Sequence, residues 1–273
     1  MEVDLHMHSI HSDGTYTPEE IVKRAKKNGV KAISLTDHDS VDGVLDGERA
    51  AKEFGVEYVK GIEISCNDDG LEVHILGYFL NLEDQKFISE IEELKLARDK
   101  RNMKIIENFK KLGIDIDIEE LKKYAPGNII SRLHFANYLI DKGIVKDKNE
   151  AFSKYLGKTG LAYEAKENFP PERAVKIIKA NGGFVSLAHP LLVSKNDLIL
   201  KNLIKKLVDY GLDGLEAQYK SFTRAEVKYL KKLAKKYKLL VTGGSDFHGD
   251  NRVGTDIGDG GLYYNQFELM KKK

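Results

Sequence analysis

Histidine and acidic residues recur along this chain in short clusters of the kind that hold metal ions. Six of the eight histidines fall at or just after the ends of strand-like stretches, close to carboxylates in the sequence. Imidazole nitrogens and carboxylate oxygens together suit Mn²⁺, Fe²⁺ and Zn²⁺ alike. The clusters therefore predict a site for more than one divalent metal ion. In chain order the candidate ligands are His6, His8, Asp13, His38, Glu63, His74, His189, Asp246 and His248.

Two of these clusters share the same spacing. His6 and His8 lie two residues apart in a strand-like stretch, so their side chains share a face and can hold one cation. Asp246 and His248 repeat the spacing within GGSDFHG, where the glycines let the backbone approach a ligand closely. A buried structural histidine pair is the alternative. The repeated occurrence of such clusters favours metal ligands. Buried charges without a partner cost several kcal/mol, so they are normally paired or bound to a metal ion.

Glu63, His74 and His189 stand singly, each in or after an apolar stretch. A carboxylate can offer one oxygen to each of two cations, so Glu63 is a candidate bridge. The alternative for Glu63 is a salt-bridged glutamate inside a barrel. A lone histidine in such a stretch is more often a core residue, but the other clusters favour a ligand role for both histidines.

The elements that must position these residues alternate between strand-like and helix-like sequence. A helix start at Thr17-Pro18-Glu19-Glu20 and its end at Asn28-Gly29 show the pattern after the first strand. This alternation predicts a parallel sheet or barrel, whose strand ends bring distant residues to one face. The predicted strands are residues 3–8, 32–36, 58–64, 73–79, 184–188, 214–217 and 239–242.

The alternation is interrupted between residues 82 and 168, where no strong strand pattern occurs. We predict a barrel domain made of residues 1–81 and 169–273, with residues 82–168 as a helical insertion above the barrel face that acts as a lid. The predicted helices of the insertion are residues 85–112, 118–124, 132–142 and 148–156.

Composition excludes some classes of protein. With 44 basic and 43 acidic residues, the net charge of +1 provides no global field that favours a polyanion. The lysines between residues 231 and 238 predict a solvated helix face, with nucleic-acid binding as the alternative. The single Cys66 excludes an internal disulfide and a cysteine-rich zinc site. Without a signal peptide or a long apolar segment, we expect a cytoplasmic protein that does not bind membranes.

Six motifs make the chain resemble the PHP (polymerase and histidinol phosphatase) domain family over almost its whole length. They are DLHMHSIHSDG at 4–14, LTDHDS at 35–40, GIEIS at 61–65, VHILGY at 73–78, LAHP at 187–190 and GSDFHG at 244–249. The resemblance implies an α/β fold, a distorted (β/α)7 barrel with the helical insertion as a subdomain. It also implies a trinuclear metal centre with three divalent ions per chain, Mn²⁺ being favoured over Fe²⁺ or Zn²⁺.

The resemblance also divides the ligands among three ions. The first ion would be held by His6, His8, Glu63 and Asp246. Glu63 would bridge to a second ion held by His74 and His189, and the third would be held by Asp13, His38 and His248. We expect a hydroxide that bridges two ions to attack phosphorus in line. Glu63 and Asp246 would then be essential for catalysis.

The insertion and the segment Ile130-Ser131-Arg132-Leu133-His134 resemble one branch of the family, which includes 3′,5′-nucleoside bisphosphate phosphatases and TrpH-like 5′→3′ RNA exonucleases. Leu133 stands where similar proteins have proline. A guanidinium suits bidentate phosphate binding. We therefore predict that Ser131, Arg132 and His134 bind phosphate, and that Arg132 and His134 also take part in catalysis. His134 or a metal-bound water would protonate the leaving oxygen. Arg173 is a further phosphate-binding candidate.

These inferences predict a metal-dependent phosphatase, a hydrolase that removes the 3′-phosphate of 3′,5′-nucleoside bisphosphates such as pAp. The alternatives are a 5′→3′ exonuclease on short RNA, a histidinol-phosphate phosphatase and a non-catalytic metal-binding module. The expected partner is a small phosphorylated substrate, a nucleotide or a short oligonucleotide. No obligate protein partner is expected.

Overall fold

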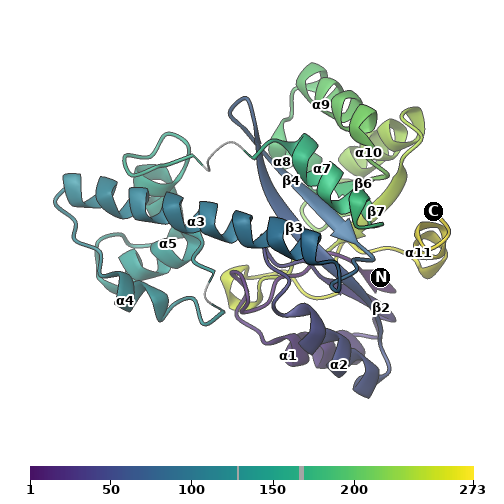
Figure 1. Ribbon diagram of the computed structural model, residues 1–273, viewed down its shortest axis with the longest axis horizontal. Coiled ribbons are helices and arrows are strands. Elements are labelled where there is room, and N and C mark those ends of the chain that lie inside the picture. The colour runs from purple at the N-terminus through teal and green to yellow at the C-terminus, as the bar shows by residue number, and fades with distance from the viewer. Residues whose placement is uncertain (128, 166–168) are drawn as a thin grey trace.

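The computed structural model describes residues 1–127, 129–165 and 169–273 (Figure 1). Seven strands form one sheet in chain order. The sheet curls into a nearly closed barrel, because the backbone N–H of Leu5, just after β1, donates to Gly243 O in β7 at 3.3 Å. The strands are β1 Val3–Asp4, β2 Ala32–Leu35, β3 Glu57–Asp68, β4 Leu71–Tyr78, β5 Phe184–Leu187, β6 Gly214–Tyr219 and β7 Leu240–Gly244.

The direction of β4 differs from the expectation of a parallel sheet. β4 pairs antiparallel with both β3 and β5, whereas the other neighbours pair in parallel. The cause is local: only Asp69 and Gly70, both with positive φ, connect β3 to β4. So short a turn can join only antiparallel strands. The seven predicted strands and the barrel are confirmed, and β4 is the one strand that departs from the parallel pairing expected from the alternation.

Helices cover the outside of the barrel (Figure 1). Thr17 caps α1 with a reciprocal capping box to Glu20, as the sequence predicts. Thr223 and Glu226 do the same for α10. The apolar faces of these helices pack on the strands and form the core of the barrel wall. The helices are α1 Pro18–Lys27, α2 Val44–Phe54, α7 Pro171–Ala180, α8 Pro190–Val193, α9 Asp197–Tyr210, α10 Arg224–Lys236 and α11 Tyr264–Met270.

Further helices lie between β4 and α7 and extend to one side of the barrel (Figure 1). They are α3 Gln85–Lys111, α4 Ile118–Lys122, α5 Arg132–Asp141 and α6 Lys148–Ala151, followed by a π-helical turn, η1 Phe152–Leu156. The predicted helices are therefore present, although the last one changes to π geometry. Buried residues between Ile105 and Ala162 form a hydrophobic cluster of their own, within which the rings of Phe109 and Phe135 stack.

None of the helices in the described residues is both long enough and apolar enough to cross a membrane.

The separate cluster of the insertion generates a prediction about its folding. Phe135→Ala removes a fully buried ring, which should lower the free energy of unfolding of the insertion by about 3–5 kcal/mol. If residues 82–168 form a subdomain, hydrogen exchange should accelerate in α4, α5 and α6 while the barrel strands stay protected. Leu96→Ala, at a side chain that is 60% exposed, is the control and should change stability by less than about 0.5 kcal/mol. Equal loss of protection in the barrel strands would contradict the subdomain.

Candidate metal centre

The structure brings the predicted ligands together at one end of the barrel. Residues 6–13 follow β1, His38 follows β2, His189 follows β5, and Asp246 and His248 follow β7. Glu63 and His74 lie within the antiparallel pair β3 and β4. Two isolated β-bridges, between Met7 and Phe247 and between His38 and Glu63, connect these segments beyond the regular sheet. Residues separated by more than 200 positions therefore share one site.

Glu63 lies at the centre of the cluster, with its side chain fully buried. Its Oε2 lies 3.0 Å from His38 Nδ1, 3.2 Å from His8 Nε2 and 3.3 Å from His6 Nε2. Its Oε1 lies 3.0 Å from His74 Nδ1 and 3.1 Å from His189 Nε2. The two oxygens thus face two different sets of imidazoles, which is the arrangement that a bridging carboxylate requires.

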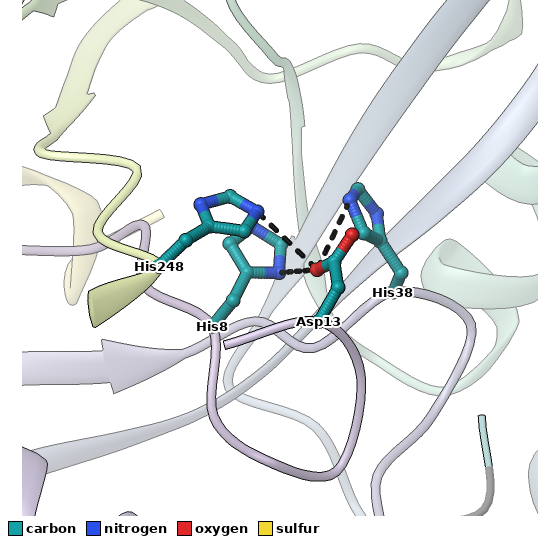
Figure 2. A group of neighbouring side chains, drawn as sticks. All are labelled: His8, Asp13, His38 and His248. Carbon is teal, nitrogen blue, oxygen red and sulfur yellow. Dashed lines mark ion pairs between the residues drawn. The ribbon is translucent and has the colours of Figure 1, made fainter. Parts of the chain in front are cut away.

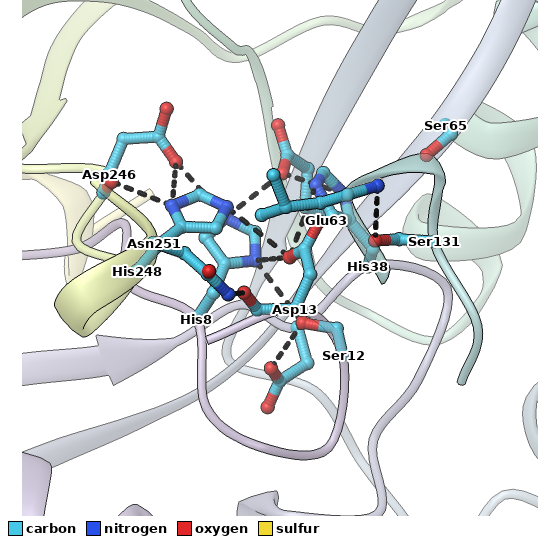
Figure 3. A network of polar contacts seen from close by, with 12 residues as sticks. His8, Ser12, Asp13, His38, Glu63, Ser65, Ser131, Asp246, His248 and Asn251 are labelled. Atoms are coloured by element: carbon cyan, nitrogen blue, oxygen red, sulfur yellow. Dashed lines mark hydrogen bonds and ion pairs between the residues drawn. The ribbon is translucent and has the colours of Figure 1, made fainter. Parts of the chain in front are cut away.

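Two aspartates complete the cluster on its other sides. Asp246 Oδ1 lies 3.2 Å from His8 Nε2 and 3.4 Å from both His6 Nε2 and His248 Nδ1. Asp13 Oδ1 lies 3.3 Å from His248 Nε2 and 3.9 Å from His8 Nδ1 and His38 Nε2 (Figure 2). His8 therefore joins the group that the resemblance assigned to Asp13, His38 and His248 alone. Figure 3 shows both aspartates around the same imidazoles.

The chemistry of these atoms fits divalent cations. Most buried side-chain nitrogen and oxygen atoms that lack a hydrogen-bond partner in the described residues belong to the predicted ligands, among them His6 Nε2, His8 Nε2 and Glu63 Oε2. Buried polar atoms without partners are costly, and a cation between them removes that cost. Ligand atoms about 2.0–2.2 Å from one ion lie about 3 Å from each other. The observed separations of 3.0 to 3.4 Å match this spacing.

The cluster also shifts the pKa values of its own members. Burial lowers the pKa of His8, but Asp246 and Glu63 outweigh it and raise that pKa to about 9. For His74, Glu63 and Glu72 likewise outweigh burial and raise the pKa to about 10. Burial raises the pKa of Glu63, but the imidazoles around it hold that pKa well below its usual value. In the metal-free protein, protons on these histidines therefore balance the carboxylates.

Glu216 of β6 contacts the cluster, and the sequence analysis missed it. It is fully buried, and its Oε1 accepts a hydrogen bond from His6 Nδ1 at 2.9 Å, while Oε2 accepts from the backbone N–H of His189 at 2.6 Å. A register shift in β6 between Glu216 and Gln218 marks a bulge of the kind that re-aims side chains beside active sites. A glutamate inside an apolar strand is the same signal that identified Glu63.

Asp246 is held from its outer side by two further residues that the sequence analysis missed. The hydroxyl of Tyr219 donates to Asp246 Oδ2 at 2.6 Å, and the guanidinium of Arg252 pairs with the same oxygen. Arg252 also donates to the Tyr219 hydroxyl oxygen at 2.8 Å. These contacts leave Asp246 Oδ1 directed at the histidines, so each oxygen of this carboxylate has a separate set of partners.

Asp37 lies beside the cluster but faces away from it. Its carboxylate accepts hydrogen bonds from the backbone N–H and the hydroxyl of Ser9, both at 2.7 Å, and from the hydroxyl of Ser12 at 2.6 Å. These bonds hold the loop that carries Asp13.

The predicted phosphate-binding residues are only partly brought together. Ser131 and Arg132 line a cavity of about 230 Å³ beside Asp13, His38 and His74. Arg132 Nη2 already donates to Glu72 Oε1 at 2.6 Å. His134 is buried and does not line this cavity.

The structure gives His134 and Arg173 other contacts. His134 Nδ1 accepts a hydrogen bond from the backbone N–H of Ser131 at 3.1 Å, as part of the capping box of α5, and burial lowers the pKa of His134. Arg173 pairs with Glu90 and Glu93 and lies over the ring of Phe169. The structure does not bring Arg173 to the cluster, because the two glutamates hold it at the interface of α3 and α7.

The same cavity contains two arginines that the sequence analysis missed. Arg98 pairs with Asp39 and donates to Ser65 Oγ at 3.3 Å. Arg101 donates to Asn102 Oδ1 at 2.8 Å and has no carboxylate within ion-pair distance in the described residues. Burial and the nearby guanidinium groups lower the pKa of Arg101 to about 9. Helical spacing was the available signal, because Leu94, Arg98, Arg101 and Ile105 share the buried face of α3.

The motif order, the barrel and the carboxylate–histidine cluster agree with a family match, since the PHP domain family covers residues 4–250. The chain belongs to the PHP domain family. It is 36% identical to a 5′-3′ exoribonuclease of Haemophilus influenzae, over 90% of this chain and 89% of the relative. It is 30% identical to a 3′,5′-nucleoside bisphosphate phosphatase of Chromobacterium violaceum, over 94% and 90% of the two chains.

The fold is also similar to a solved structure. An amidohydrolase of Chromobacterium violaceum, solved with bound sulfate and no metal, superposes with a TM-score of 0.87 and 29% identity, covering 94% of this chain and 90% of the other. These comparisons confirm the predicted family and barrel and agree with the predicted class of hydrolase. They leave the roles of individual site residues as predictions.

The bond between Glu216 and His6 generates a prediction about metal affinity. The carboxylate keeps the His6 proton on Nδ1 and leaves the Nε2 lone pair free for a cation. Glu216→Gln keeps the volume but replaces one of the two acceptor oxygens by a donor NH₂, so only one of the bonds to His6 and His189 can persist and metal affinity should fall about 10- to 100-fold. Competition titration with Mn²⁺ measures this, with Glu19→Gln on the exposed surface of α1 as the control. Unchanged affinity in a variant with native melting would contradict this role.

A second prediction concerns protons. Metal ions must displace protons from His8 and His74, whose pKa values are raised to about 9 and about 10. Apparent metal affinity should therefore rise as pH increases towards about 9, and binding should release protons. Calorimetric titrations in two buffers with different ionisation enthalpies would detect the release. Identical heats in both buffers, together with an affinity that does not depend on pH, would contradict it.

Proposed function

We propose that this chain is a metal-dependent phosphoesterase that hydrolyses the 3′-phosphate of 3′,5′-nucleoside bisphosphates such as pAp. The observation that carries the proposal is that the carboxylate–histidine cluster and an arginine-lined cavity adjoin one another. A carboxylate–histidine cluster that fits divalent cations opens directly into a cavity lined by Arg98, Arg101 and Arg132. The relative named as a 3′,5′-nucleoside bisphosphate phosphatase, which aligns over nearly the whole chain, supports the same substrate class.

The two features suit the two phosphates of such a substrate. The arginine cavity, which we define by Arg98, Arg101, Arg132 and Ser131, would bind the 5′-phosphate, while the 3′-phosphate lies at the cluster. Arg101 is the best donor in this cavity, because in the described residues its guanidinium donates to Asn102 and lies within ion-pair distance of no carboxylate. A buried guanidinium of this kind offers a planar pair of donors to a phosphate.

We propose three divalent ions per chain, with Mn²⁺ favoured over Fe²⁺ or Zn²⁺. The ligands would be those of the sequence analysis, with Glu63 as the bridge and His8 contributing beside Asp13. When bound, such ions lower the pKa of water and neutralise the charge that develops on phosphoryl oxygens. Glu216, Tyr219 and Arg252 would orient the ligands through the hydrogen bonds described above.

Around the substrate, the residues of the chain would act mainly by position and charge. Arg132 is tied to Glu72, whose Oε1 also lies 3.5 Å from His74 Nε2. Arg132 would thus bind phosphate at its free edge and steady His74 through Glu72. His134 holds the backbone of Ser131, so we propose that it shapes the cavity rather than protonates the leaving oxygen.

A 5′→3′ exonuclease on short RNA is the second candidate function. The relative from Haemophilus influenzae, named as a 5′-3′ exoribonuclease, supports it. A 5′-phosphorylated RNA and pAp share the same first part, a nucleoside with phosphates on both its 5′ and 3′ oxygens. The arginine cavity would serve both substrates in the same way.

The experiment compares pAp, AMP, histidinol phosphate and 5′-phosphorylated RNA with Mn²⁺. Phosphate release measures hydrolysis of the first three, and chromatography of the released mononucleotides measures hydrolysis of the RNA. We expect pAp to be cleaved with a higher kcat/KM than AMP or histidinol phosphate, because only pAp fills both anion sites. Arg101→Ala should raise KM for pAp about 10- to 100-fold, the size of a lost charge-assisted hydrogen bond. Arg49→Ala, at a side chain that is 79% exposed on α2, is the matched control and should change nothing.

The assay has clear contrary outcomes. No hydrolysis of any of these substrates by a metal-replete sample would reject the proposed function. A higher kcat/KM for histidinol phosphate than for pAp would reject the substrate class. Glu63→Ala and Asp246→Ala should abolish turnover, and retained activity in either variant would reject the proposed metal centre.

A further inference from the structure

Helix α10 carries a concentration of positive charge that the proposed function does not use. Its 13 residues include six basic side chains and one acidic side chain, a net charge of +5 in a chain whose total is +1. Figure 1 shows α10 on the outside of the barrel, away from the insertion. Five of the basic residues line a groove of about 510 Å³ along one side of this helix. These five form the basic face of α10: Arg224, Lys228, Lys231, Lys232 and Lys235.

The charges of the basic face are not neutralised within the described part of the chain. Glu226, the only acidic residue of α10, has other partners. Its Oε2 accepts hydrogen bonds from the backbone N–H and the hydroxyl of Thr223, and its Oε1 lies 3.8 Å from Lys195 Nζ. Lys231 donates to the uncharged amide oxygen of Gln218 at 2.6 Å. Among the described residues, no carboxylate lies within ion-pair distance of any member of the basic face.

Other helices of the barrel pair their exposed lysines with acidic residues one turn away. The pairs in α1, α7 and α9 are Glu19 with Lys23, Glu172 with Lys176 and Asp197 with Lys201. Such pairs stabilise a helix by about 0.2–0.5 kcal/mol each, whereas like charges at the same spacing destabilise it by similar amounts. The helix dipole favours Lys235 in the last turn of α10, but not Lys228 or Lys232. A polyanionic partner therefore explains the basic face better than solvation alone.

The groove along the basic face begins beside the barrel mouth. Phe222 lines the groove just before α10, and its ring centroid lies 4.8 Å from that of Tyr219. The hydroxyl of Tyr219 donates to Asp246 in the carboxylate–histidine cluster. From there α10 leads back towards the start of β7, and its residues from Arg224 to Lys235 extend over about 16 Å. A polymer that reaches the cluster can therefore continue along the basic face.

A nucleic-acid strand is the polyanion that suits this groove best. Its phosphates form a regular row, and lysines that neutralise them release the counterions of the strand, which favours binding. The partly exposed ring of Phe222 at one end of the groove offers a surface on which a base can stack. A lipid surface would require apolar side chains that project beyond the cations. The apolar residues of this groove, Phe222 and Val227, are instead partly buried.

We propose that the basic face of α10 is a docking surface for the phosphates of a single-stranded nucleic acid, separate from the metal centre. Its contacts are electrostatic and do not depend on base sequence, because they reach phosphates and not base edges. The inference goes beyond the proposed function, since binding at this surface requires neither metal ions nor a 5′-phosphate. It holds whichever phosphate ester the cluster cleaves.

Fluorescence anisotropy tests the proposal with the metal-free protein in EDTA and a fluorescein-labelled oligouridine that has a 5′-hydroxyl. The combined variant Lys228→Gln/Lys232→Gln/Lys235→Gln should raise the Kd for this RNA about tenfold or more. The slope of the logarithm of the binding constant against the logarithm of salt concentration should decrease in magnitude by about 2, because each lost phosphate contact contributes about 0.7. The melting temperature and the kcat/KM for pAp with Mn²⁺ should equal those of the wild type.

A matched control removes the same charge elsewhere. Lys23→Gln/Lys26→Gln/Lys27→Gln changes three exposed lysines of α1, and the affinity for oligouridine and its salt slope should stay those of the wild type. Equal losses of affinity in the two combined variants would overturn the proposal, because net charge and not the basic face would then determine binding.

The remaining outcomes separate this inference from the proposed function and from other polyanions. Absence of oligouridine binding by the wild type at low salt would overturn the inference and leave pAp hydrolysis untouched. Binding that depends on the basic face in a protein that hydrolyses no phosphate ester would reject the proposed function alone. Displacement of the RNA by polyglutamate at equal charge concentration would overturn the assignment to a nucleic acid. Binding to phosphatidylserine vesicles more tightly than to oligouridine would overturn it as well.

Discussion

The structure depends on one fully buried carboxylate, Glu63, and on the positive charge that must surround it. A charged group in the interior is tolerated only with partners, and five imidazole nitrogens approach the two oxygens of Glu63 within 3.3 Å. In the metal-free protein, the raised pKa values of His8 and His74 favour protons there as part of the balancing charge, and cations would replace these protons. The barrel must therefore bring histidines from several strands to this point, and the bond from Leu5 to Gly243 closes it there.

Two carboxylates of the cluster, Glu63 and Asp246, each have different partners on their two oxygens. Glu63 faces different imidazoles with its two oxygens, and Asp246 directs Oδ1 at histidines while Oδ2 is held by Tyr219 and Arg252. Glu216 accepts hydrogen bonds from the ring of His6 and from the backbone N–H of His189, and these bonds hold both residues in place. Such bonds cost little in a rigid barrel, where the strands already hold both partners.

The insertion contributes positively charged guanidinium groups, whereas the barrel contributes the carboxylates and imidazoles of the cluster. Its long helix α3 places Arg98 and Arg101 at the cluster, and the start of α5 adds Ser131 and Arg132. The barrel thus provides the groups that would hold cations, and the insertion provides the groups that would hold an anion. Both sets meet at His38 and His74, so the position of the insertion relative to the barrel would set the distance between the two phosphate sites.

The sequence by itself determined the strands, the helices and the members of the carboxylate–histidine cluster, because these depend on local patterns: apolar periodicity, capping residues such as Thr17, and histidines after strands. It did not determine the direction of β4, the partners of Arg173 or the place of Arg101. A one-dimensional pattern shows that Arg101 lies on the inner face of α3, but not that this face meets the cluster. Only the tertiary structure decides which charges meet, since a buried cation and its nearest carboxylate can be far apart in the chain, and their pairing depends on how the layers pack.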